Sequence, residues 1–274
     1  IPPTRSDGAI QARHRLGIVI EDVRLRREND FAVDLDEIKK LTDARTKLLL
    51  VNSPHNPTGA TVSNAQMREL HDFAVDRGIP FVSDEVYHPI YHEDETSSAA
   101  VLPHAIVVGS FSKALSLSGL RTGWIIDRDR ARQRQYLDAR GYFTISNSPL
   151  AEALALVALR HRDRILARTQ NCATANLHSL YQFFAEWKDK VGWVRPRGGT
   201  ICFPWLKRGG NAREFCSAVA ERGTLLAPGD CFGMQDHFRL GFGVTENGFA
   251  EALQTIADQL TTMADKAVST TVSL

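Results

Sequence analysis

A lysine set among small hydroxylated residues is the first candidate for chemistry in this chain. Lys113 lies in the stretch GSFSKALSLSGLRTGW, which places Ser110 and Ser112 just before it and Arg121 eight positions after it. An amine can condense with an aldehyde, while serine hydroxyls and a planar guanidinium can bind a phosphate. An isolated lysine is nearly always a solvated surface charge, so the rest of the sequence must decide between these interpretations.

A second polar group follows an apolar run. The run KLLLVN, residues 47–52, is followed by Asn56 in the sequence NPTG. Taken alone, Asn-Pro-Thr-Gly is the sequence of an ordinary β-turn. In open α/β sheets, however, ligands bind beyond the carboxyl ends of the strands. If residues 47–52 form such a strand, Asn56 lies where a ligand would bind.

A third polar pair follows the apolar run at residues 79–85. Asp84 lies at the end of this run, and Tyr87 comes shortly after it. A lone aspartate in such a place more often caps a turn than binds a ligand. Two strand ends that carry polar groups toward one edge are less easily explained by capping. We therefore expect Asn56, Asp84, Tyr87 and the loop of Lys113 to lie together.

These side chains need strands and helices to hold them. Short apolar runs rich in β-branched residues predict buried strands at residues 17–23, 47–52, 79–85, 105–110 and 123–126. Helical patterns lie between them at residues 34–43 and 63–78, with Ser63 as the predicted N-cap and Gly78 as the stop. This alternation predicts an α/β fold with a mostly parallel central sheet flanked by helices.

The pattern changes at about residue 147, where a long helical tract begins. Beyond the tract, strands are predicted at residues 192–196, 200–206, 223–229 and 237–243, and helices at residues 211–222 and 247–264. We therefore expect a large domain at residues 1–146, and an interdomain helix with a smaller C-terminal α+β domain at residues 147–274.

Composition excludes several classes of function. Lys plus Arg number 33 and Asp plus Glu number 32, so the formal net charge of +1 offers no broad basic field for nucleic acid or an anionic membrane. The expected partner is a small molecule or another protein. No stretch approaches the roughly 20 apolar residues that span a bilayer, and no leader resembling a signal peptide is visible. The expected location is the cytoplasm.

Cysteines and histidines give no sign of a metal site. Four cysteines are spread along the chain without any CxxC pair: Cys172, Cys202, Cys216 and Cys231. This spacing predicts reduced thiols rather than a zinc site or a disulfide framework. His88 and His92 are four residues apart, but Pro89 between them disfavours a regular helix. We predict that both histidines are loop residues and that no metal binds there.

The three polar groups together match one kind of cofactor, which carries an aldehyde, a basic ring nitrogen, a ring hydroxyl and a phosphate. Lys113 can condense with the aldehyde, and Asp84 can keep the ring nitrogen protonated so that the ring withdraws electrons. Asn56 and Tyr87 can hydrogen-bond the ring oxygen. The serines and the arginine around the lysine can hold the phosphate.

The chain resembles the class I/II aminotransferases in an ordered set of motifs: NPTG, SDEVYH, SFSKALSLSGLRTGW, RPRGGTICFPW, APGDCF and HFRLGFG. Members of this family are fold type I enzymes that use pyridoxal 5'-phosphate (PLP). Each motif is weak alone, whereas the ordered set, covering nearly all of the chain, is specific. The resemblance implies reversible amino transfer between an α-amino acid and a 2-oxo acid, in an enzyme that is commonly a homodimer.

The resemblance also implies roles for the residues of the first three motifs. Lys113 would form a Schiff base with PLP and, once substrate displaces it, move the proton between the substrate Cα and C4' of the cofactor. Asp84 would pair with the pyridine nitrogen. Asn56 and Tyr87 would hydrogen-bond the phenolic oxygen.

Two further roles follow from the same resemblance. The phosphate would be held by Ser110 and Arg121, with Ser112 as an additional contact. In HFRLGFG, Arg239 matches the arginine that grips the substrate α-carboxylate, a task that suits a planar guanidinium fork. Without the resemblance, Arg239 would be interpreted as a surface arginine on an edge strand.

The chain departs from the family pattern at its beginning. Members usually carry, ahead of the matched region, a turn and helix N-terminus that bind the phosphate, and an aromatic side chain that stacks on the ring. The sequence starts at Ile1, just beyond that aromatic position, so we expect the PLP domain to be incomplete. Two alternatives stay open beside amino transfer: another PLP-dependent reaction, such as C–S β-elimination, decarboxylation or racemisation, and a truncated remnant without catalysis.

Overall fold

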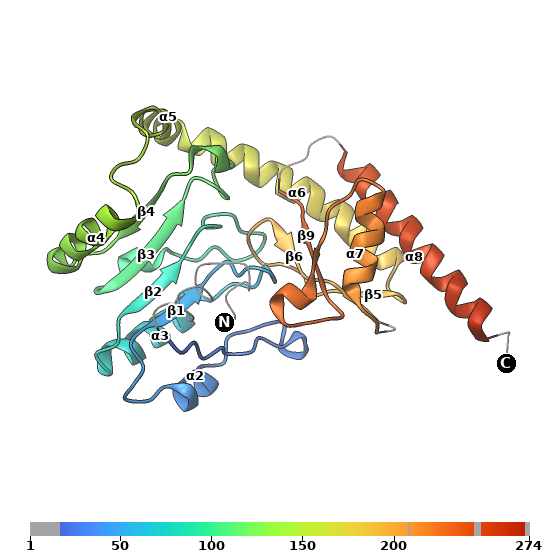
Figure 1. The fold of residues 1–274 in the computed structure, drawn as a ribbon, viewed down its shortest axis with the longest axis horizontal. Helices are drawn as coiled ribbons and strands as arrows, with labels where there is room; N and C mark the ends of the chain where they lie inside the picture. Colours follow the sequence, from blue (N-terminus) through green and yellow to red (C-terminus); the bar gives the residue numbers. More distant parts are fainter. Residues whose placement is uncertain (1–16, 208, 244–247, 272–274) are drawn as a thin grey trace.

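A four-stranded sheet organises the first half of the chain (Figure 1). The structure is a computed structural model that describes residues 17–207, 209–243 and 248–271. In spatial order the strands are β1 (Leu49–Asn52), β2 (Phe81–Asp84), β3 (Ala105–Ser110) and β4 (Gly123–Ile126). The first three are parallel, and β4 is antiparallel to β3. The predicted α/β class with a mostly parallel sheet is therefore confirmed.

The helices of this half begin where the sequence predicts. The Asp34 side chain caps α2 (Leu35–Leu41) by accepting hydrogen bonds from two backbone amides of the first turn. At the start of α3 (Asn64–Asp76), Ser63 and Gln66 form a reciprocal capping box. The loops also contain short 3-10 helices: η1 (Arg27–Asn29), η2 (Ala99–Val101) and η3 (Ser118–Leu120).

The apolar face of α3 packs against the sheet. Met67, Leu70 and Ala74 recur at helical spacing and share one buried cluster with Val51 and Phe81 of the strands. This burial, more than intrinsic helix propensity, stabilises such a helix. The packing fixes β1 and β2 beneath α3, and with them the loops that leave their carboxyl ends.

Two of the predicted buried strands are wrong in whole or in part. Residues 17–23 form no strand, and Ile18 and Val19 are 47% and 73% exposed. In the described part of the chain no strand pairs with this segment, so its backbone lacks a ladder partner. β4 does form, but all its residues are exposed because it is an edge strand with β3 as its one neighbour in the described sheet.

The long helical tract predicted from about residue 147 is confirmed as two successive helices, α5 (Pro149–Arg160) and α6 (Arg162–Glu186), and a further helix, α4 (Arg130–Phe143), precedes it. Figure 1 shows α6 running from beside α5 to the small sheets of the second half. Asp129 caps α4, and Ser148 followed by a proline caps α5. The tract thus connects the two halves of the molecule.

The second half is built from short antiparallel strands. One sheet pairs β5 (Val191–Gly192) with β7 (Trp205–Leu206), and the other has the order β6 (Ile201–Cys202), β9 (Phe238–Gly241), β8 (Ala227–Pro228). The single strand predicted at residues 200–206 is wrong, because Pro204 lacks the backbone N–H needed to continue a ladder. The strands predicted at residues 192–196 and 223–229 are present only as the short β5 and β8.

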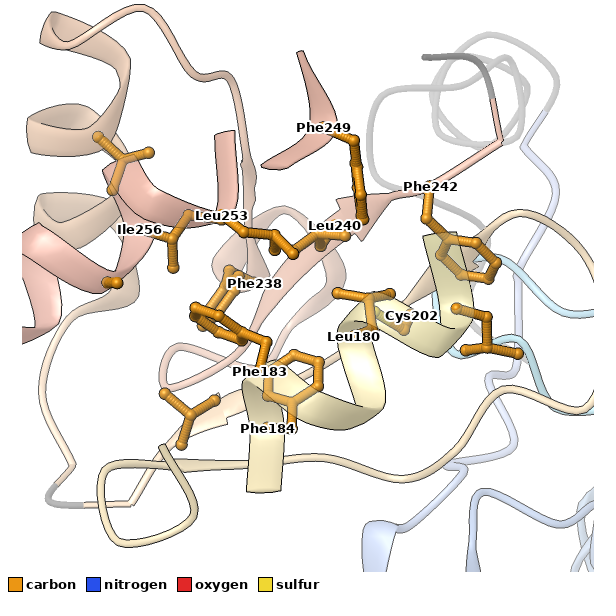
Figure 2. Packing of buried hydrophobic residues seen from close by; sticks show 14 of the residues in the cluster. Leu180, Phe183, Phe184, Cys202, Phe238, Leu240, Phe242, Phe249, Leu253 and Ile256 are labelled. Carbon is orange, nitrogen blue, oxygen red and sulfur yellow. The ribbon is translucent and has the colours of Figure 1, made fainter. Parts of the chain in front are cut away.

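Two helices and a short 3-10 helix complete this half: α7 (Ala212–Glu221), η4 (Gly229–Phe232) and α8 (Phe249–Thr271). Figure 2 shows the hydrophobic core of the second half, in which Leu180 and Phe183 of α6 lie with Phe238 and Leu240 of β9. Ile256 of α8 belongs to the same cluster. Phe238 and Leu240 alternate along β9 and point into this core, which leaves Arg239 on the opposite face.

None of the helices in the described residues combines the length and apolar composition required to cross a bilayer. All four cysteines carry free thiols in the structure.

Candidate active site

Three parallel strands end in polar residues at one edge of the sheet. Asn52 is the last residue of β1, Asp84 of β2 and Ser110 of β3, and Asn52 and Asp84 are direct neighbours in the register. The carboxyl ends of adjacent parallel strands lie side by side, so the loops that follow them converge. Those loops carry the remaining candidates from the first half of the chain.

Asn52 joins two of these loops, a role that was not identified from the sequence. Its Nδ2 donates to the backbone oxygen of Asp84 at 3.0 Å, and its Oδ1 accepts from the backbone N–H of Asn56 at 2.7 Å. The backbone N–H of Ser53 donates to the same Asp84 oxygen. The signal available in the sequence was an asparagine ending the strand four residues before Asn56.

The NPTG turn is anchored to the second half of the chain. The carbonyl of Gly59 accepts hydrogen bonds from the backbone N–H groups of Arg197 and Gly198. Gly59 has a φ of +71°, and a Cβ there would lie 2.7 Å from the carbonyl oxygen of Ile201. Only glycine meets both requirements, because the conformation is left-handed and the approach is close. The turn that carries Asn56 is therefore held in place from both halves.

Arg239 reaches this edge from β9. Its Nη1 donates to Oδ1 of Asn56 at 2.8 Å, across 183 residues of sequence. The guanidinium carbon lies 5.3 Å from the centre of the Phe232 ring, a cation–π distance. Arg239 is half-buried, and its fork has five N–H donors, so further donors remain for an anionic ligand. This arrangement suits a carboxylate.

Tyr87 lies within electrostatic reach of both Asp84 and Arg239. Its side chain is buried, and burial raises the pKa of its hydroxyl to about 12, with Asp84 raising it and Arg239 lowering it. The hydroxyl is therefore protonated at neutral pH and can donate a hydrogen bond. Its ring packs on Gly199, where a Cβ would approach the ring to 3.3 Å. Asp84 Oδ1 accepts from the N–H of Val86 at 3.1 Å.

Lys113 lies on the neighbouring loop, with its backbone fixed and its side chain exposed. The next residue, Ala114, is buried and donates from its N–H to the oxygen of Val86 at 3.3 Å. The Lys113 carbonyl accepts from the N–H of Ser116 at 2.9 Å. These contacts tie the lysine loop to the segment between Asp84 and Tyr87 and leave the amine accessible to a ligand.

The residues predicted to bind the phosphate make mainly local contacts. Ser110 Oγ accepts from the N–H of Ser112 at 3.2 Å, and Ser110 faces Gly123 in the β3–β4 pair. Arg121 has a φ of 51°, and its Nη1 donates to the oxygen of Ser118, within its own loop. The structure therefore brings the arginine loop beside β3, while the side chain of Arg121 bonds within its own loop.

The polar groups at this edge form a coherent set. Asn56 and Arg239 are in contact, Tyr87 interacts with Asp84 and Arg239, and the Lys113 loop is hydrogen-bonded beside them. The set offers a carboxylate, a protonated phenol, an amide, an exposed amine and a guanidinium within one edge of an α/β sheet. Such groups can bind a ring with a basic nitrogen, an aldehyde and a small carboxylate.

Among curated proteins, the chain is similar to capreomycidine synthase from Streptomyces vinaceus, with 32% identity over 88% of this chain and 62% of the relative. It is also similar to a probable aspartate/prephenate aminotransferase from Aquifex aeolicus, with 26% identity over 91% of this chain and 66% of the relative. The chain thus spans less than two thirds of the length of these relatives.

The chain is also similar to solved structures of PLP-dependent enzymes. A PLP-dependent aminotransferase from Streptococcus suis superposes with a TM-score of 0.80 at 30% identity, covering 86% of this chain and 63% of its own. The PLP-dependent cyclase OrfR superposes with a TM-score of 0.77 at 31% identity, covering 83% of this chain and 62% of its own. Both comparisons confirm the fold predicted from the sequence.

A sequence model described as "Aminotransferase class I and II" matches residues 10–256. The match includes every candidate site residue discussed above and runs through both halves of the chain. The chain therefore belongs to the class I and II aminotransferase family.

Proposed function

We propose that this chain forms the greater part of a PLP-dependent aminotransferase, which moves an amino group between an α-amino acid and a 2-oxo acid. The observation that carries the proposal is the contact between Asn56 and Arg239, with Tyr87 in electrostatic reach of the arginine. This contact joins Asn56, which suits a cofactor ring, to Arg239, which suits a substrate carboxylate. Amino transfer needs both in one site.

The residues present fit PLP in their chemistry. Asp84 can pair with the ring nitrogen, and Asn56 and Tyr87 can hydrogen-bond the ring oxygen. Because burial keeps the Tyr87 hydroxyl protonated, it can donate to an oxyanion on the ring. The exposed amine of Lys113 can meet the aldehyde. Ser110, Ser112 and Arg121 are proposed to hold the phosphate.

PLP, when bound, supplies an aldehyde that takes up the substrate amino group and a ring that accepts electrons from Cα. Asp84 holds the proton on the ring nitrogen. Arg239 binds the α-carboxylate through its guanidinium fork and so orients the Cα–H bond. Lys113 Nζ would then carry the proton from the substrate Cα to C4' of PLP, the former aldehyde carbon. Asn56 would hold the fork of Arg239 through their hydrogen bond.

The other expectations from the sequence belong to this proposal. We propose a homodimer in the cytoplasm, with a PLP domain ending at about residue 146 and a small domain after it. The near-zero net charge and the free cysteines support an intracellular small-molecule enzyme. Light scattering after size-exclusion chromatography of the full-length protein tests the dimer.

A second candidate function is a different PLP-dependent reaction on the same scaffold. The observation that favours it is that capreomycidine synthase and the cyclase OrfR are 32% and 31% identical to this chain, and neither name denotes an aminotransferase. The proposed residues hold the cofactor and the carboxylate, which both kinds of reaction need. Products distinguish them, because amino transfer requires a 2-oxo acid acceptor and yields a new amino acid.

The proposed role of Lys113 can be tested with full-length protein titrated with PLP. The wild type is expected to develop a visible absorption band that Lys113→Ala lacks. Lys188→Ala removes an exposed lysine from the second half and is expected to retain the band. A band that persists unchanged in Lys113→Ala would remove the lysine from the proposal. Absence of PLP binding in the wild type would favour the non-catalytic remnant.

A further inference from the structure

A histidine with no exposed surface lies immediately before β9, two residues before Arg239, in an isolated antiparallel bridge with Trp205. His237 Nδ1 is 2.6 Å from Oδ1 of Asp236, while its Nε2 is buried without a hydrogen-bond partner. Aromatic rings surround it, with ring centres at 4.8 Å for Phe203 and 5.5 Å for Trp205. Burying a polar nitrogen without a hydrogen-bond partner costs free energy of folding. The presence of this histidine therefore calls for an explanation.

The carboxylate is in turn held by an arginine from the far end of the chain. Arg27, in η1, donates from Nη1 to Oδ2 of Asp236 at 2.9 Å, across 209 residues of sequence. Its guanidinium carbon lies 5.0 Å from the centre of the Trp205 ring. Both charged side chains are about one third exposed, with 34% for Arg27 and 33% for Asp236. The ion pair therefore combines geometric fit with partial desolvation.

The segment that carries Arg27 is fixed to both halves of the molecule. Val23 is buried in the cluster that contains the central sheet and α3. Leu25 and Phe31 are buried in another cluster, together with Phe203 of the second half. Arg27 lies between these anchors, so the two clusters set its position, and its contact is made to the turn just before β9.

The histidine and the substrate-binding candidate share one face of the strand. Side chains two residues apart point to the same side, so His237 and Arg239 lie together, while Phe238 enters the core. A row of rings also connects them. Phe203 lies 4.8 Å from His237 and 5.4 Å from Phe232, and the Arg239 guanidinium lies over Phe232 at 5.3 Å.

Backbone hydrogen bonds hold the main chain of Asp236 and His237 in place. The oxygen of Asp236 accepts from the N–H of Leu206 at 2.9 Å, and the oxygen of His237 accepts from the N–H of Gly229 at 2.7 Å. A Cβ at Gly229 would collide with the His237 carbonyl. With the backbone held in this way, the direction of the side chains on this face of the strand is the remaining variable.

We propose that Arg27, Asp236 and His237 form a positioning relay that sets the direction of Arg239, and that Arg27 is therefore a positioning residue for the substrate carboxylate. The inference rests on the proposed function for the identity of the ligand. Arg27 holds the Asp236 carboxylate through the ion pair, and the carboxylate holds the imidazole through a hydrogen bond. The contacting rings of Phe203 and Phe232 then set the position of the Arg239 guanidinium. Without Arg27, Arg239 keeps its strand but loses its fixed direction toward Asn56.

The test uses the full-length, PLP-loaded protein as wild type, Arg27→Gln, Arg27→Lys and Arg222→Gln. Arg222 makes an exposed ion pair of 3.0 Å with Asp258 and serves as the matched control. The probes are α-methyl-L-aspartate and α-methyl-L-phenylalanine, which present an α-carboxylate but have no Cα proton to lose. Their dissociation constants are measured by the change in the visible spectrum, beside the dissociation constant of PLP.

Arg27→Gln is expected to weaken binding of the better probe about tenfold, since one oriented ion pair is lost, and to change PLP affinity less than twofold. Arg27→Lys is expected to recover part of the loss, and Arg222→Gln to match the wild type. The same pattern is expected as a higher KM with little change in kcat for any amino acid that reacts. Unchanged probe affinity in Arg27→Gln would overturn the relay.

A second measurement is independent of the reaction. The order parameter of the Arg239 Nε–H bond, from ¹⁵N relaxation, is expected to be lower in Arg27→Gln than in the wild type and in Arg222→Gln, because the side chain loses its fixed direction. Equal order parameters in all three proteins would overturn the inference even if no reaction is detected. Failure of the wild type to bind PLP or either probe would instead count against the proposed function, and the order parameters would then decide the relay alone.

Discussion

Nη1 of Arg239 lies 2.8 Å from Oδ1 of Asn56, although the two residues are 183 positions apart in the chain. Asn56 follows a strand of the central sheet, and Arg239 lies on a strand of the second half. Their contact places the guanidinium proposed to bind the substrate carboxylate against the edge where the cofactor ring is proposed to lie. In the proposed function, one hydrogen bond therefore connects cofactor and substrate recognition.

Substituting Arg239 by lysine is expected to raise KM for the amino acid by about 10- to 100-fold, because a point charge replaces a bidentate fork. The affinity for PLP is expected to change little, since Arg239 is assigned to the substrate. Steady-state kinetics and a PLP titration of the same preparation separate the two effects. A large loss of PLP affinity with an unchanged KM would place Arg239 in the cofactor site instead.

Tyr87→Phe removes a hydroxyl that burial keeps protonated up to a pKa of about 12. The ring still packs on Gly199, so the fold is expected to tolerate the change. The affinity for PLP is expected to fall about tenfold, in line with the loss of one hydrogen bond to a charged acceptor. Tyr142→Phe, at a highly exposed tyrosine, is the control. Identical PLP affinities for both variants would contradict the role of Tyr87.

Asn52→Ala is expected to lower the free energy of unfolding by about 1–3 kcal/mol, because the Asp84 carbonyl and the Asn56 N–H both lose a partner. It is also expected to lower kcat/KM, since Asn56 is then free to move relative to Asp84. Chemical denaturation and kinetics measure the two effects. Asn171→Ala, on the exposed face of α6, should leave both unchanged. Wild-type kinetics in Asn52→Ala would show that this linkage does not position the site.

His55 is expected to make the protein sensitive to acid. Burial lowers the pKa of this histidine to about 3, whereas an unfolded chain titrates near 6.5. Between these two values the unfolded state binds the extra proton, so stability is complete above pH 6.5 and falls as the pH falls. His55 is expected to contribute about 3 kcal/mol to the loss between pH 7 and pH 4.

The pH dependence is measured by urea unfolding at several pH values in wild type and His55→Asn. The variant is expected to show a shallower fall of the unfolding free energy toward pH 4, whatever its stability at pH 7. If its slope equals that of the wild type, another group is responsible for the acid sensitivity.

The sequence predicted those parts of the fold that depend on local pattern. The run at residues 105–110 became β3 over the same residues, and Ser63 caps its helix as expected, because β-branched runs and capping side chains act over a few residues. The strand predicted at residues 17–23 failed because a strand also needs a neighbour. The exposure of β4 has the same origin, since its apolar residues resemble those of a central strand.

The candidate site also contains residues that the sequence predicted and a contact that it did not. Asn56, Asp84 and Lys113 were predicted from strand ends and ordered motifs, and the structure places their loops side by side. The pairing of Arg27 with Asp236 could not be predicted, because two charged residues 209 positions apart carry no periodic or turn signal. Such contacts are set by tertiary packing rather than by local sequence.

The most direct test of the central claim follows the amino group itself. Full-length protein with PLP is incubated with a panel of ¹⁵N-labelled amino acids and an unlabelled 2-oxo acid, and mass spectrometry detects the products. We predict that ¹⁵N appears in the amino acid derived from the 2-oxo acid, that the donor becomes its own 2-oxo acid in equal amount, and that Lys113→Ala abolishes both. Release of ¹⁵N as ammonia, or a rearranged product formed without the acceptor, would contradict amino transfer.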